Sequence, residues 1–566
     1  MKSQINIGVI LCRCGGRIDR KLNLKALKNY VSGLAGVRSV SIKDQLCTSP
    51  AALKEKRLRG IVVAACSVKK HIELFRDSLE TSQIPVSRCA FVDLRGIADR
   101  RMPDAVISTE MAKLIIKAHV EKLAASPAPV PNARRGGVAQ AMDTSRGAVT
   151  RRGFLRLPLI ASNIISPYEE MPMVDGKRCV AAMSPCRGCI RQCPANALEF
   201  KEGKVRVIHH LCLQCGLCAT ICPVDAVQMP TFSAFQGLKL VDALADRAFS
   251  LEHRALIFTC DKGCENLSVK IKDLQFGRLN LIIVRVPCVA SLLPGILLRS
   301  IELGFEALAV LCPDKNCRKT TALDVWKYQM SSVFKGIKFQ GAASRLAFFQ
   351  INSEEKDDLS QLRNHLLLNQ KAGSLNPNPV AVPPDLRSGL IRILGALVQD
   401  ESFLNASIKG ISFPFFDLQI AQEKCCLCGA CARQCPAAAL EIIGAESETQ
   451  IQFSTARCIG CGQCVAICPG EAISLTRIMN LLKLSNGETE IKISEENARC
   501  KRCGTVIGKK RLLKEVEKKM KKSGFETLAA RTFYCQACRN IVDMEGPDCQ
   551  CPESSNLQEA GSQNFL

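Results

Sequence analysis

Four runs of cysteine, each ending in Cys-Pro, constrain this chain more than any other feature of its sequence. Three of the runs match the spacing CxxCxxCxxxCP in full, and the first is incomplete. In this spacing, three cysteines of one run and the last cysteine of a partner run bind one [4Fe–4S] cluster. The runs form two close pairs, as that exchange requires, so the sequence predicts two domains with two clusters each. They lie at 186–193, 212–222, 425–435 and 458–468.

Length and cysteine content argue against a small disulfide-bonded protein. With 566 residues the chain is too long for one core, so several domains are expected. Its 33 cysteines are odd in number and gathered in short motifs, which favours metal ligation in a reducing compartment. No apolar run reaches the roughly 18 residues that cross a bilayer. The stretch TRRGFLR at 150–156 resembles an export signal but lies far inside the chain, so we expect a cytoplasmic protein without a membrane span.

The formal net charge of +24 raises the question of nucleic-acid binding. That count treats cysteine as neutral, whereas ligating cysteines are thiolates. A four-thiolate site carries about −2 overall, so seven such sites would leave roughly +10. Aromatic residues, which stack on single-stranded bases, make up only 5% of the chain. Nucleic acid is therefore not an expected partner.

The apolar pattern predicts a multidomain protein of α/β plus α+β class. Two regions alternate short apolar runs with helical periods, which is typical of a parallel sheet covered by helices. Segments rich in proline, glycine or polar residues separate the domains. The expected order is an α/β domain (1–125), a linker (126–170), a dicluster domain resembling bacterial-type ferredoxins (171–240), a second α/β domain (245–372), a linker (373–412), a second ferredoxin-like dicluster domain (413–485), a zinc-ribbon-like module (490–548) and a disordered tail (549–566).

Several cysteines directly or nearly follow an expected strand of the two α/β domains. Strands are expected at 5–11, 60–65, 89–94, 255–259, 281–286, 307–311 and 346–351, and helices at 22–34 and 71–80. Functional groups gather at the carboxyl ends of strands in open parallel sheets. Cysteines brought there from distant parts of the sequence could therefore bind one cluster. They are Cys12, Cys66, Cys260, Cys288 and Cys312.

The exchange of the fourth ligand between runs gives three complete ligand sets. Small residues between the cysteines let the backbone wrap a cluster and donate N–H groups to sulfur. The sets are Cys212, Cys215 and Cys218 with Cys193; Cys425, Cys428 and Cys431 with Cys468; and Cys458, Cys461 and Cys464 with Cys435.

The first run departs from the pattern at Met183, which stands where its first cysteine should be. Either Cys179 ligates through a lengthened loop, or the cluster has three cysteine ligands and is [3Fe–4S]. We favour Cys179, because Ser184 and Pro185 help to form the detour that this loop requires. The expected set is Cys179, Cys186, Cys189 and Cys222.

Three stretches of the second α/β domain are similar to the delta subunit of methyl-viologen-reducing hydrogenases, an electron-transfer module. They are LIFTCDKGCENLS, VRVPCVASLLPGILLRSIELGFEALAVLCPDKNC and RLAFFQINSEE. The resemblance implies a [2Fe–2S] cluster held by four of five cysteines, and it leaves open which one is spare. The five are Cys260, Cys264, Cys288, Cys312 and Cys317.

The first α/β domain resembles the N-terminal domain of the flavin-carrying iron–sulfur subunit of heterodisulfide reductases through IGVILCRCGGRI, VVAACSVKKHIELFR and VDLR. The resemblance implies a fifth [4Fe–4S] cluster. The family usually has a cysteine shortly after this arginine, where the present chain has Ala98, and Cys89 is the substitute that we nominate. The expected ligands are Cys12, Cys47, Cys66 and Cys89, with Cys14 as a rival. The family's flavin domain carries a glycine-rich fingerprint that this sequence lacks, so no flavin is expected in this chain.

Two CxxC pairs near the C-terminus predict one further metal site. Four thiolates from paired knuckles suit tetrahedral zinc, which contributes to folding. An additional iron–sulfur cluster is the alternative, since both metals accept four thiolates. The expected ligands are Cys500, Cys503, Cys535 and Cys538.

No pattern for flavin, nickel or a catalytic nucleophile is evident, so two-electron chemistry on a small molecule is not expected. The sequence predicts a non-catalytic electron-transfer subunit that relays single electrons. Its partners would be a hydrogenase, a formate dehydrogenase or a separate flavin subunit on one side, and a heterodisulfide-reductase-like acceptor on the other. Two alternatives stay open: a self-contained cluster-based reductase of a disulfide-type substrate, and a metal-binding regulatory protein that binds nucleic acid.

Overall fold

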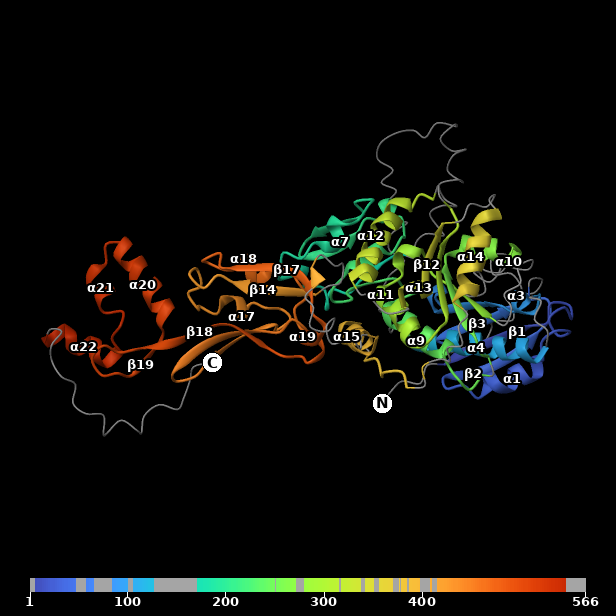
Figure 1. Ribbon diagram of the computed structural model, residues 1–566, viewed down its shortest axis with the longest axis horizontal. Helices are drawn as coiled ribbons and strands as arrows, with labels where there is room; N and C mark the ends of the chain where they lie inside the picture. The colour runs from blue at the N-terminus through green and yellow to red at the C-terminus, as the bar shows by residue number, and fades with distance from the viewer. Residues whose placement is uncertain are drawn as a thin grey trace, which may run out of the picture. The chain divides into compact units, whose positions relative to one another are not determined.

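A computed structural model describes most of the chain, which divides into two compact units (Figure 1). One unit comprises Met1–Ala182 and Arg187–Asn405, and the other comprises Met183–Cys186 and Ala406–Leu566. The described residues are 6–46, 58–65, 84–99, 105–126, 171–249, 251–270, 279–314, 317–336, 342–350, 356–369, 376, 378–383, 386–397, 408–409 and 415–545.

In the residues that the structure describes, the N-terminal domain contains a parallel four-stranded sheet and the helices that accompany it. Its elements are β1 (Ile7–Cys12), α1 (Leu24–Ser32), β2 (Val37–Lys43), β3 (Gly60–Ala65), β4 (Cys89–Asp93), α3 (Leu94–Asp99) and α4 (Ala105–Ala124). The strand order is β2-β1-β3-β4, and all pairs are parallel. Strands β1 and β3 are buried along their whole length, because each is a continuous apolar run. The prediction of a parallel sheet is confirmed here, and β2 adds a strand that the sequence pattern did not indicate.

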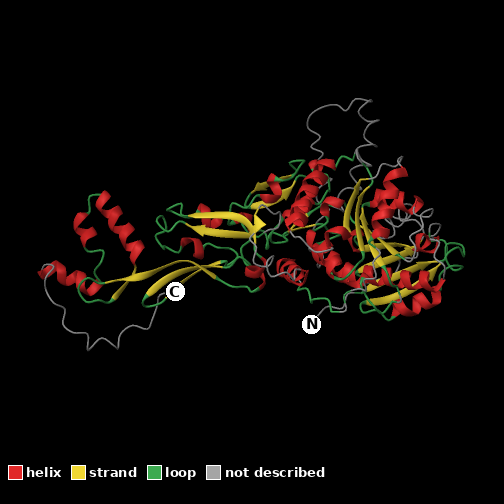
Figure 2. Ribbon diagram, in the orientation of Figure 1, coloured by secondary structure: helices red, strands yellow, loops and turns green. Residues whose placement is uncertain are grey.

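A second parallel sheet, of order β10-β9-β11-β12, forms the core of the other α/β domain. Its elements are β9 (Arg254–Thr259), α10 (Asp261–Lys270), β10 (Asn280–Arg285), the 3-10 turn η7 (Val289–Ser291), α11 (Pro294–Glu302), β11 (Ala307–Cys312), α12 (Thr320–Gly336), α13 (Ala342–Arg345), β12 (Leu346–Gln350) and α14 (Lys356–Leu368). Each of the four strands predicted for this domain is present, which follows from their short, uninterrupted apolar runs. Figure 2 shows these strands and the helices of the domain.

The first dicluster domain is built from short elements around its cysteines. They are β5 (Met173–Val174), the 3-10 turn η4 (Val180–Ala182), α7 (Gly188–Arg191), β6 (Leu198–Lys201), β7 (Lys204–Val207), the 3-10 turn η5 (His209–Leu211), α8 (Leu217–Ile221), β8 (Val227–Gln228) and α9 (Ala234–Leu244). Antiparallel pairs join β5 with β8 and β6 with β7. Helix α9 begins with a capping box between Ser233 and Gln236, and it packs against both α4 and α11.

The second dicluster domain shares a sheet with the C-terminal module. The elements are β13 (Ile408–Lys409), β14 (Phe416–Ile420), α17 (Ala430–Arg433), β15 (Leu440–Gly444), β16 (Glu448–Phe453), α18 (Gln463–Ala466), β17 (Ile473–Met479), α19 (Leu481–Ser485), β18 (Glu490–Arg499), β19 (Val506–Lys509), α20 (Lys510–Lys522), α21 (Glu526–Ala530) and α22 (Gln536–Glu545). The long strand β18 pairs with β16 on one side and with β19 on the other (Figure 1). Cys500 of the C-terminal module therefore directly follows a strand of a sheet that also belongs to the dicluster domain.

The segment 373–412, which the sequence indicates as a linker, contains the helix α15 (Leu386–Leu397). Its side chains Leu390, Ile393 and Leu394 are buried, and the helix packs against α11. Prolines ahead of this helix suggested a linker, whereas apolar spacing of three and four residues gives the helix a face to bury. The helix expected at 71–80, the linker 126–170 with its TRRGFLR stretch, and the tail 549–566 lie outside the described residues. Among the helices that the structure describes, none is long and apolar enough to cross a membrane.

Candidate metal centres

The four Cys-Pro turns share one backbone geometry. In each turn, the amide of an alanine four residues after the cysteine donates a hydrogen bond to the cysteine sulfur, at 3.2 to 3.3 Å. The residue before this alanine has a positive φ of 46° to 52°. Hydrogen bonds of this kind stabilise a thiolate and tune a metal bound to it. The cysteine and alanine pairs are Cys193 and Ala197, Cys222 and Ala226, Cys435 and Ala439, and Cys468 and Ala472.

The three complete runs also share two left-handed residues between their cysteines. The third position of each run has a φ of 55° to 63°, and the fifth position is a glycine with a φ of 72° to 81°. A short helix (α8, α17 or α18) begins directly after each of these glycines. The first run differs at both positions, because proline fixes a negative φ at Pro185 and Arg187 has a φ of −140°. The backbone of the first run therefore follows another path.

In the first dicluster domain, the sulfur of Cys193 lies beside the three cysteines of the complete run. Burial raises the pKa of Cys212, Cys215 and Cys218, and the neighbouring Cys193 thiol raises each of these pKa values further. All four cysteines line one pocket whose remaining lining is mostly apolar. Four sulfurs gathered around an apolar pocket fit a cluster, since a cluster shares the charge of its thiolates and is held by four of them.

The second dicluster domain brings together two groups of cysteines in the same way. Burial raises the pKa of Cys425 and, to about 11, that of Cys431, and the nearby Cys468 contributes to both shifts. Burial likewise raises the pKa of Cys464 to about 12, with Cys435 among the thiols that add to the shift. Each group thus contains three cysteines of one run and the Cys-Pro cysteine of the other. Those of the second group, which line one pocket, are Cys435, Cys458, Cys461 and Cys464.

The irregular first run contributes to a site with a different loop. Cys179, Cys189 and Cys222 all pack against one buried cluster of apolar side chains. Met183 is 59% exposed, so its side chain does not take the place of the missing cysteine in the core. Cys186 falls in the segment Met183–Cys186, which groups with the other compact unit. The structure therefore places Cys179 with two of its three expected partners and does not group Cys186 with them.

Four cysteines of the second α/β domain lie near one another beyond the carboxyl ends of β9, β10 and β11. Burial raises the pKa of Cys260, Cys288 and Cys312, in the case of Cys288 to about 12. The thiol of Cys260 adds to the shift at Cys288 and Cys312, and that of Cys317 adds to the shift at Cys312. Two amides at the start of α10 donate to the Cys260 sulfur, which opposes its rise in pKa. Cys264 is half-buried within α10.

In the N-terminal domain, Cys12 lies at the carboxyl end of the parallel strands, and Cys89 lies toward their amino end. Cys12 ends β1, whereas Cys89 begins β4 and pairs with Ile61 at the start of β3. Along the strand direction, the positions of Cys12 and Cys89 are four residues apart, which corresponds to about 13 Å. This separation argues against Cys89 as a partner of Cys12 in one site. Both Cys14 and Cys89 pack against the buried cluster that contains Cys12, but Cys14 follows Cys12 by two residues at the same end of the sheet and is the better candidate. Cys47 and Cys66 lie outside the described residues.

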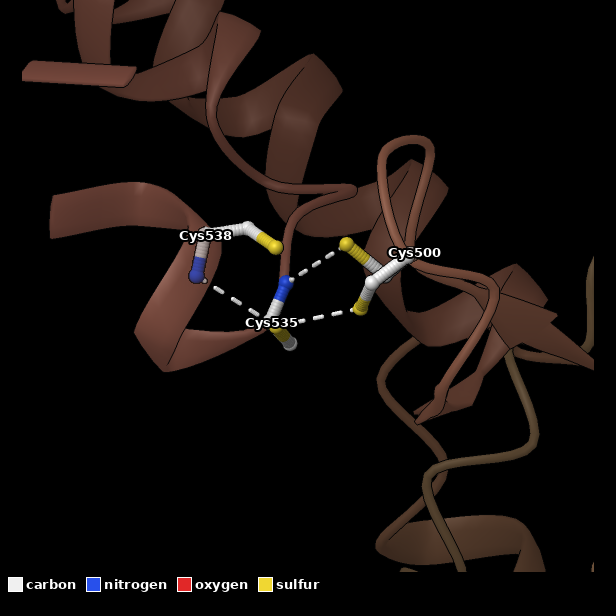
Figure 3. Close-up of side chains that lie close together, drawn as sticks. Cys500, Cys535 and Cys538 are labelled. Atoms are coloured by element: carbon white, nitrogen blue, oxygen red, sulfur yellow. Dashed lines mark hydrogen bonds between the residues drawn. The ribbon is translucent and has the colours of Figure 1, made fainter. Parts of the chain in front are cut away.

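The four cysteines of the C-terminal module converge. Their sulfur atoms all lie within 4.8 Å of one another. Cys500 follows β18, and Cys535 directly precedes α22 (Figure 3). The Cys535 amide donates to the Cys500 sulfur at 3.3 Å, and the Cys538 amide donates to the Cys535 sulfur at 3.4 Å. Ligands at about 2.3 Å from a tetrahedral ion lie about 3.8 Å apart, so this spacing fits one metal ion of the zinc type.

Hydrogen bonds prepare two of these sulfurs for a cation. Those from Thr505 lower the pKa of Cys503 to about 6. Burial would raise the pKa of Cys500, but amides including those of Cys503 and Cys535 outweigh it and lower that pKa. A lowered thiol pKa increases the fraction of thiolate, which is the form that binds metal.

The sequence patterns did not indicate how the first dicluster domain meets the second α/β domain. Lys319, which directly precedes α12, donates a hydrogen bond from its Nζ to the carbonyl oxygen of Gln214 at 3.1 Å. These residues lie 105 positions apart. A single lysine without a motif around it carries no signal for such a contact, so only the fold reveals it.

Comparison with known families identifies three parts of the chain. Residues 205–228 match a 4Fe-4S binding domain, residues 418–475 match a 4Fe-4S dicluster domain, and residues 256–368 match the delta subunit of methyl-viologen-reducing hydrogenase. These matches confirm the expected combination of ferredoxin domains with a hydrogenase delta-subunit domain.

Curated relatives include iron–sulfur subunits of heterodisulfide reductases at low identity. The chain is 25% identical over 308 residues to one subunit of the H(2):CoB-CoM heterodisulfide,ferredoxin reductase of Methanothermobacter thermautotrophicus, covering 47% of this chain and 46% of the relative. It is 26% identical over 260 residues to a protein of Archaeoglobus profundus that is itself named for its likeness to a heterodisulfide reductase subunit, covering 39% and 36%. It is 31% identical over 64 residues to hydrogenase-4 component A of Escherichia coli, covering 11% and 28%. The chain thus spans less than half the length of these relatives.

Proposed function

We propose that this chain is an iron–sulfur electron-transfer subunit, which relays single electrons between a partner oxidoreductase and a heterodisulfide-reductase-like acceptor. The observation that carries the proposal is the Cys-Pro turn, which occurs four times with an alanine amide donating to a sulfur. Bound clusters would supply one-electron redox chemistry at these sites. The chain itself holds the thiolates, donates hydrogen bonds to them and buries them, and these are the factors by which a protein sets reduction potentials.

The ligand sets for three [4Fe–4S] clusters follow the groups of neighbouring cysteines described above. They are Cys193, Cys212, Cys215 and Cys218; Cys425, Cys428, Cys431 and Cys468; and Cys435, Cys458, Cys461 and Cys464. For the fourth cluster we propose Cys179, Cys189 and Cys222 together with Cys186, which is nominated by its place in the cysteine run alone. Packing of Cys179 on the core that Cys189 and Cys222 also contact supports a detour through Cys179 over a three-cysteine site.

The remaining centres rest on other observations. Neighbouring thiols support Cys260, Cys288, Cys312 and Cys317 as the ligands of a [2Fe–2S] cluster, with Cys264 as the alternative to one of them. Close convergence of four sulfurs supports zinc in the C-terminal module. A fifth [4Fe–4S] cluster in the N-terminal domain rests on the family resemblance, with Cys12 and Cys14 as the described candidates.

The electron donor and acceptor would be separate chains of a redox complex in the cytoplasm. The names of the relatives point to enzymes that act with heterodisulfides, ferredoxin or hydrogen. For the donor side we propose a hydrogenase, a formate dehydrogenase or a flavin subunit, since this chain's sequence lacks a glycine-rich dinucleotide fingerprint. The positive charge that remains once the thiolates are counted, roughly +10, suits the docking of acidic ferredoxin-like partners.

Anaerobic purification with metal, sulfide and EPR analysis tests the proposal. Five [4Fe–4S] centres and one [2Fe–2S] centre predict about 22 iron atoms per chain, with about one zinc. Fewer than about ten iron atoms per chain in a fully reconstituted sample would refute the proposal that electrons pass through a series of clusters in this protein. Turnover of a disulfide by the isolated chain, or its retention on DNA with a steep salt dependence, would instead support one of the two alternatives.

A further inference from the structure

Two cysteine-bearing segments of different domains meet within the first compact unit. One is the ferredoxin loop 212–218, whose helix α8 packs against the turn η7. The other is the segment 288–291, which contains Cys288 and η7. The thiol of Cys215 adds to the rise in the pKa of Cys288 that burial chiefly causes, so these two cysteines are close enough to interact electrostatically. A candidate ligand of each domain therefore lies at this contact.

Glycine is required at the centre of the contact. Gly216 has a φ of 72°, and a Cβ atom placed on it would lie 2.4 Å from the Cβ of Ser291. Ser291 is almost fully buried, and its hydroxyl donates to the carbonyl oxygen of Cys288 at 2.7 Å. The two segments thus approach at backbone distance, with the serine tied to the loop of the candidate ligand.

Lys319 directly precedes α12, a helix that packs against η7, and it ties this part of the α/β domain to the ferredoxin loop. Lys319 follows Cys317 by two residues and has a half-buried side chain. Its Nζ donates a hydrogen bond to the carbonyl oxygen of Gln214 at 3.1 Å. The amide of Gln214 in turn donates to the sulfur of Cys212 at 3.4 Å. Gln214 is buried and left-handed, with a φ of 56°. The lysine therefore contacts the residue that shapes the ferredoxin loop and hydrogen-bonds a candidate ligand.

Lys319 brings a positive charge to candidate ligands of both domains. Its ammonium donates to the carbonyl oxygen of Gln214, whose amide donates to the Cys212 sulfur, and the lysine follows Cys317 by two residues. A nearby cation favours the more negative state of a group. The same charge would favour the reduced state of an iron centre on either side.

We propose that Lys319 is a positioning residue for electron transfer between the first dicluster domain and the delta-subunit-like domain. It ties the loop 212–218 to the start of α12, which packs against η7, and its charge would favour the reduced state of the centres on both sides. With iron bound at both sites, one electron would pass across this contact, so the donor centre would be oxidised and the acceptor centre reduced. The inference rests on the proposed function, because it requires iron at both sites.

The test uses the full-length, fully reconstituted chain and its variants Lys319→Met and Lys319→Arg. Midpoint potentials of the two-iron and four-iron signals are measured by EPR during redox titration. The four-iron signal in question is identified as the one that Cys212→Ser removes. In Lys319→Met both potentials should shift to more negative values, since a cation has been removed beside both centres. Lys319→Arg keeps the charge and should leave both potentials close to those of the unmodified chain.

A matched control removes a lysine charge that lies near the candidate two-iron site alone. Lys262 pairs with Asp314, and its ammonium lies near Cys260 and Cys317. Lys262→Met should therefore shift the two-iron signal alone. Unchanged potentials in Lys319→Met at full iron content, or a shift at only one centre, would overturn the inference and leave the proposed function intact. Absence of iron from either site would also overturn the inference alone, whereas fewer than about ten iron atoms per chain would refute the proposed function with it.

Discussion

Substitution of Gly216 by alanine tests how closely the backbone of the loop 212–218 approaches that of the segment 288–291. An alanine in the left-handed region destabilises the folded state by about 1–2 kcal/mol. Because alanine has less conformational freedom than glycine in the unfolded chain, the substitution also stabilises folding by about 0.4–1 kcal/mol. The added Cβ would also lie 2.4 Å from the Cβ of Ser291 and 3.1 Å from its Cα, so the backbones must separate. Forced packing of this kind costs about 1–3 kcal/mol. We therefore expect Gly216→Ala to weaken the contact by about 3 kcal/mol in total.

Gly462→Ala is the matched control, because Gly462 occupies the same position in the last cysteine run. Its φ is 81°, and an added Cβ would meet its nearest neighbour at an ordinary 3.4 Å. This variant should show the backbone cost alone, about 1 kcal/mol.

Hydrogen exchange read by mass spectrometry reports the local opening free energy of each segment. An excess of about 2 kcal/mol corresponds to roughly 30-fold faster exchange. We expect this acceleration in peptides that cover 212–222 and also in those that cover 286–293. Equal acceleration in the two glycine variants, or acceleration confined to 212–222, would refute the reasoning that the two backbones are in contact.

Three further predictions follow from charge and metal ligation. Arg299 forms a buried network with two carboxylates, so Arg299→Met should destabilise its domain by about 3–5 kcal/mol, whereas Arg206→Met, at an exposed ion pair, should cost at most about 1 kcal/mol. Urea unfolding, followed by the fluorescence of the single tryptophan, Trp326, measures the effect of Arg299→Met. Thermal unfolding compares the two variants. Burial, aided by nearby positive charges, lowers the pKa of His119 to about 3, so below pH 6.5 the unfolded chain takes up a proton that the folded chain does not. Stability should then fall by up to about 1.4 kcal/mol per pH unit, and His119→Leu should flatten the dependence of melting temperature on pH between 7 and 5. Cys535→Ser should remove the metal ion of the C-terminal module, seen as a loss of zinc with the iron content unchanged; retained zinc would contradict the assignment.

The sequence predicted those features whose causes are local. The ligands of a dicluster domain lie within short runs, and continuous apolar runs such as 60–65 specify buried parallel strands. Strand β2 (Val37–Lys43) alternates polar and apolar residues at the edge of a sheet, so it lacks that signal. The position of Cys89 along the sheet depends on where β4 begins. The ends of helices and strands are the features that a sequence pattern predicts least well. The contact of Lys319 with Gln214 joins residues 105 positions apart, so no local pattern could have predicted it.

The irregular run shows why a missing cysteine is only part of a changed site. A complete run needs left-handed residues at its third and fifth positions, as Gly460 and Gly462 show in the last run. Pro185 cannot adopt a positive φ, and the steric cost of the left-handed region disfavours it for Arg187. A cysteine restored at position 183 would therefore not rebuild the standard loop. The proline, the arginine and the methionine together specify another path for the chain, and a ligand from earlier in the sequence suits that path because the detour begins before the run.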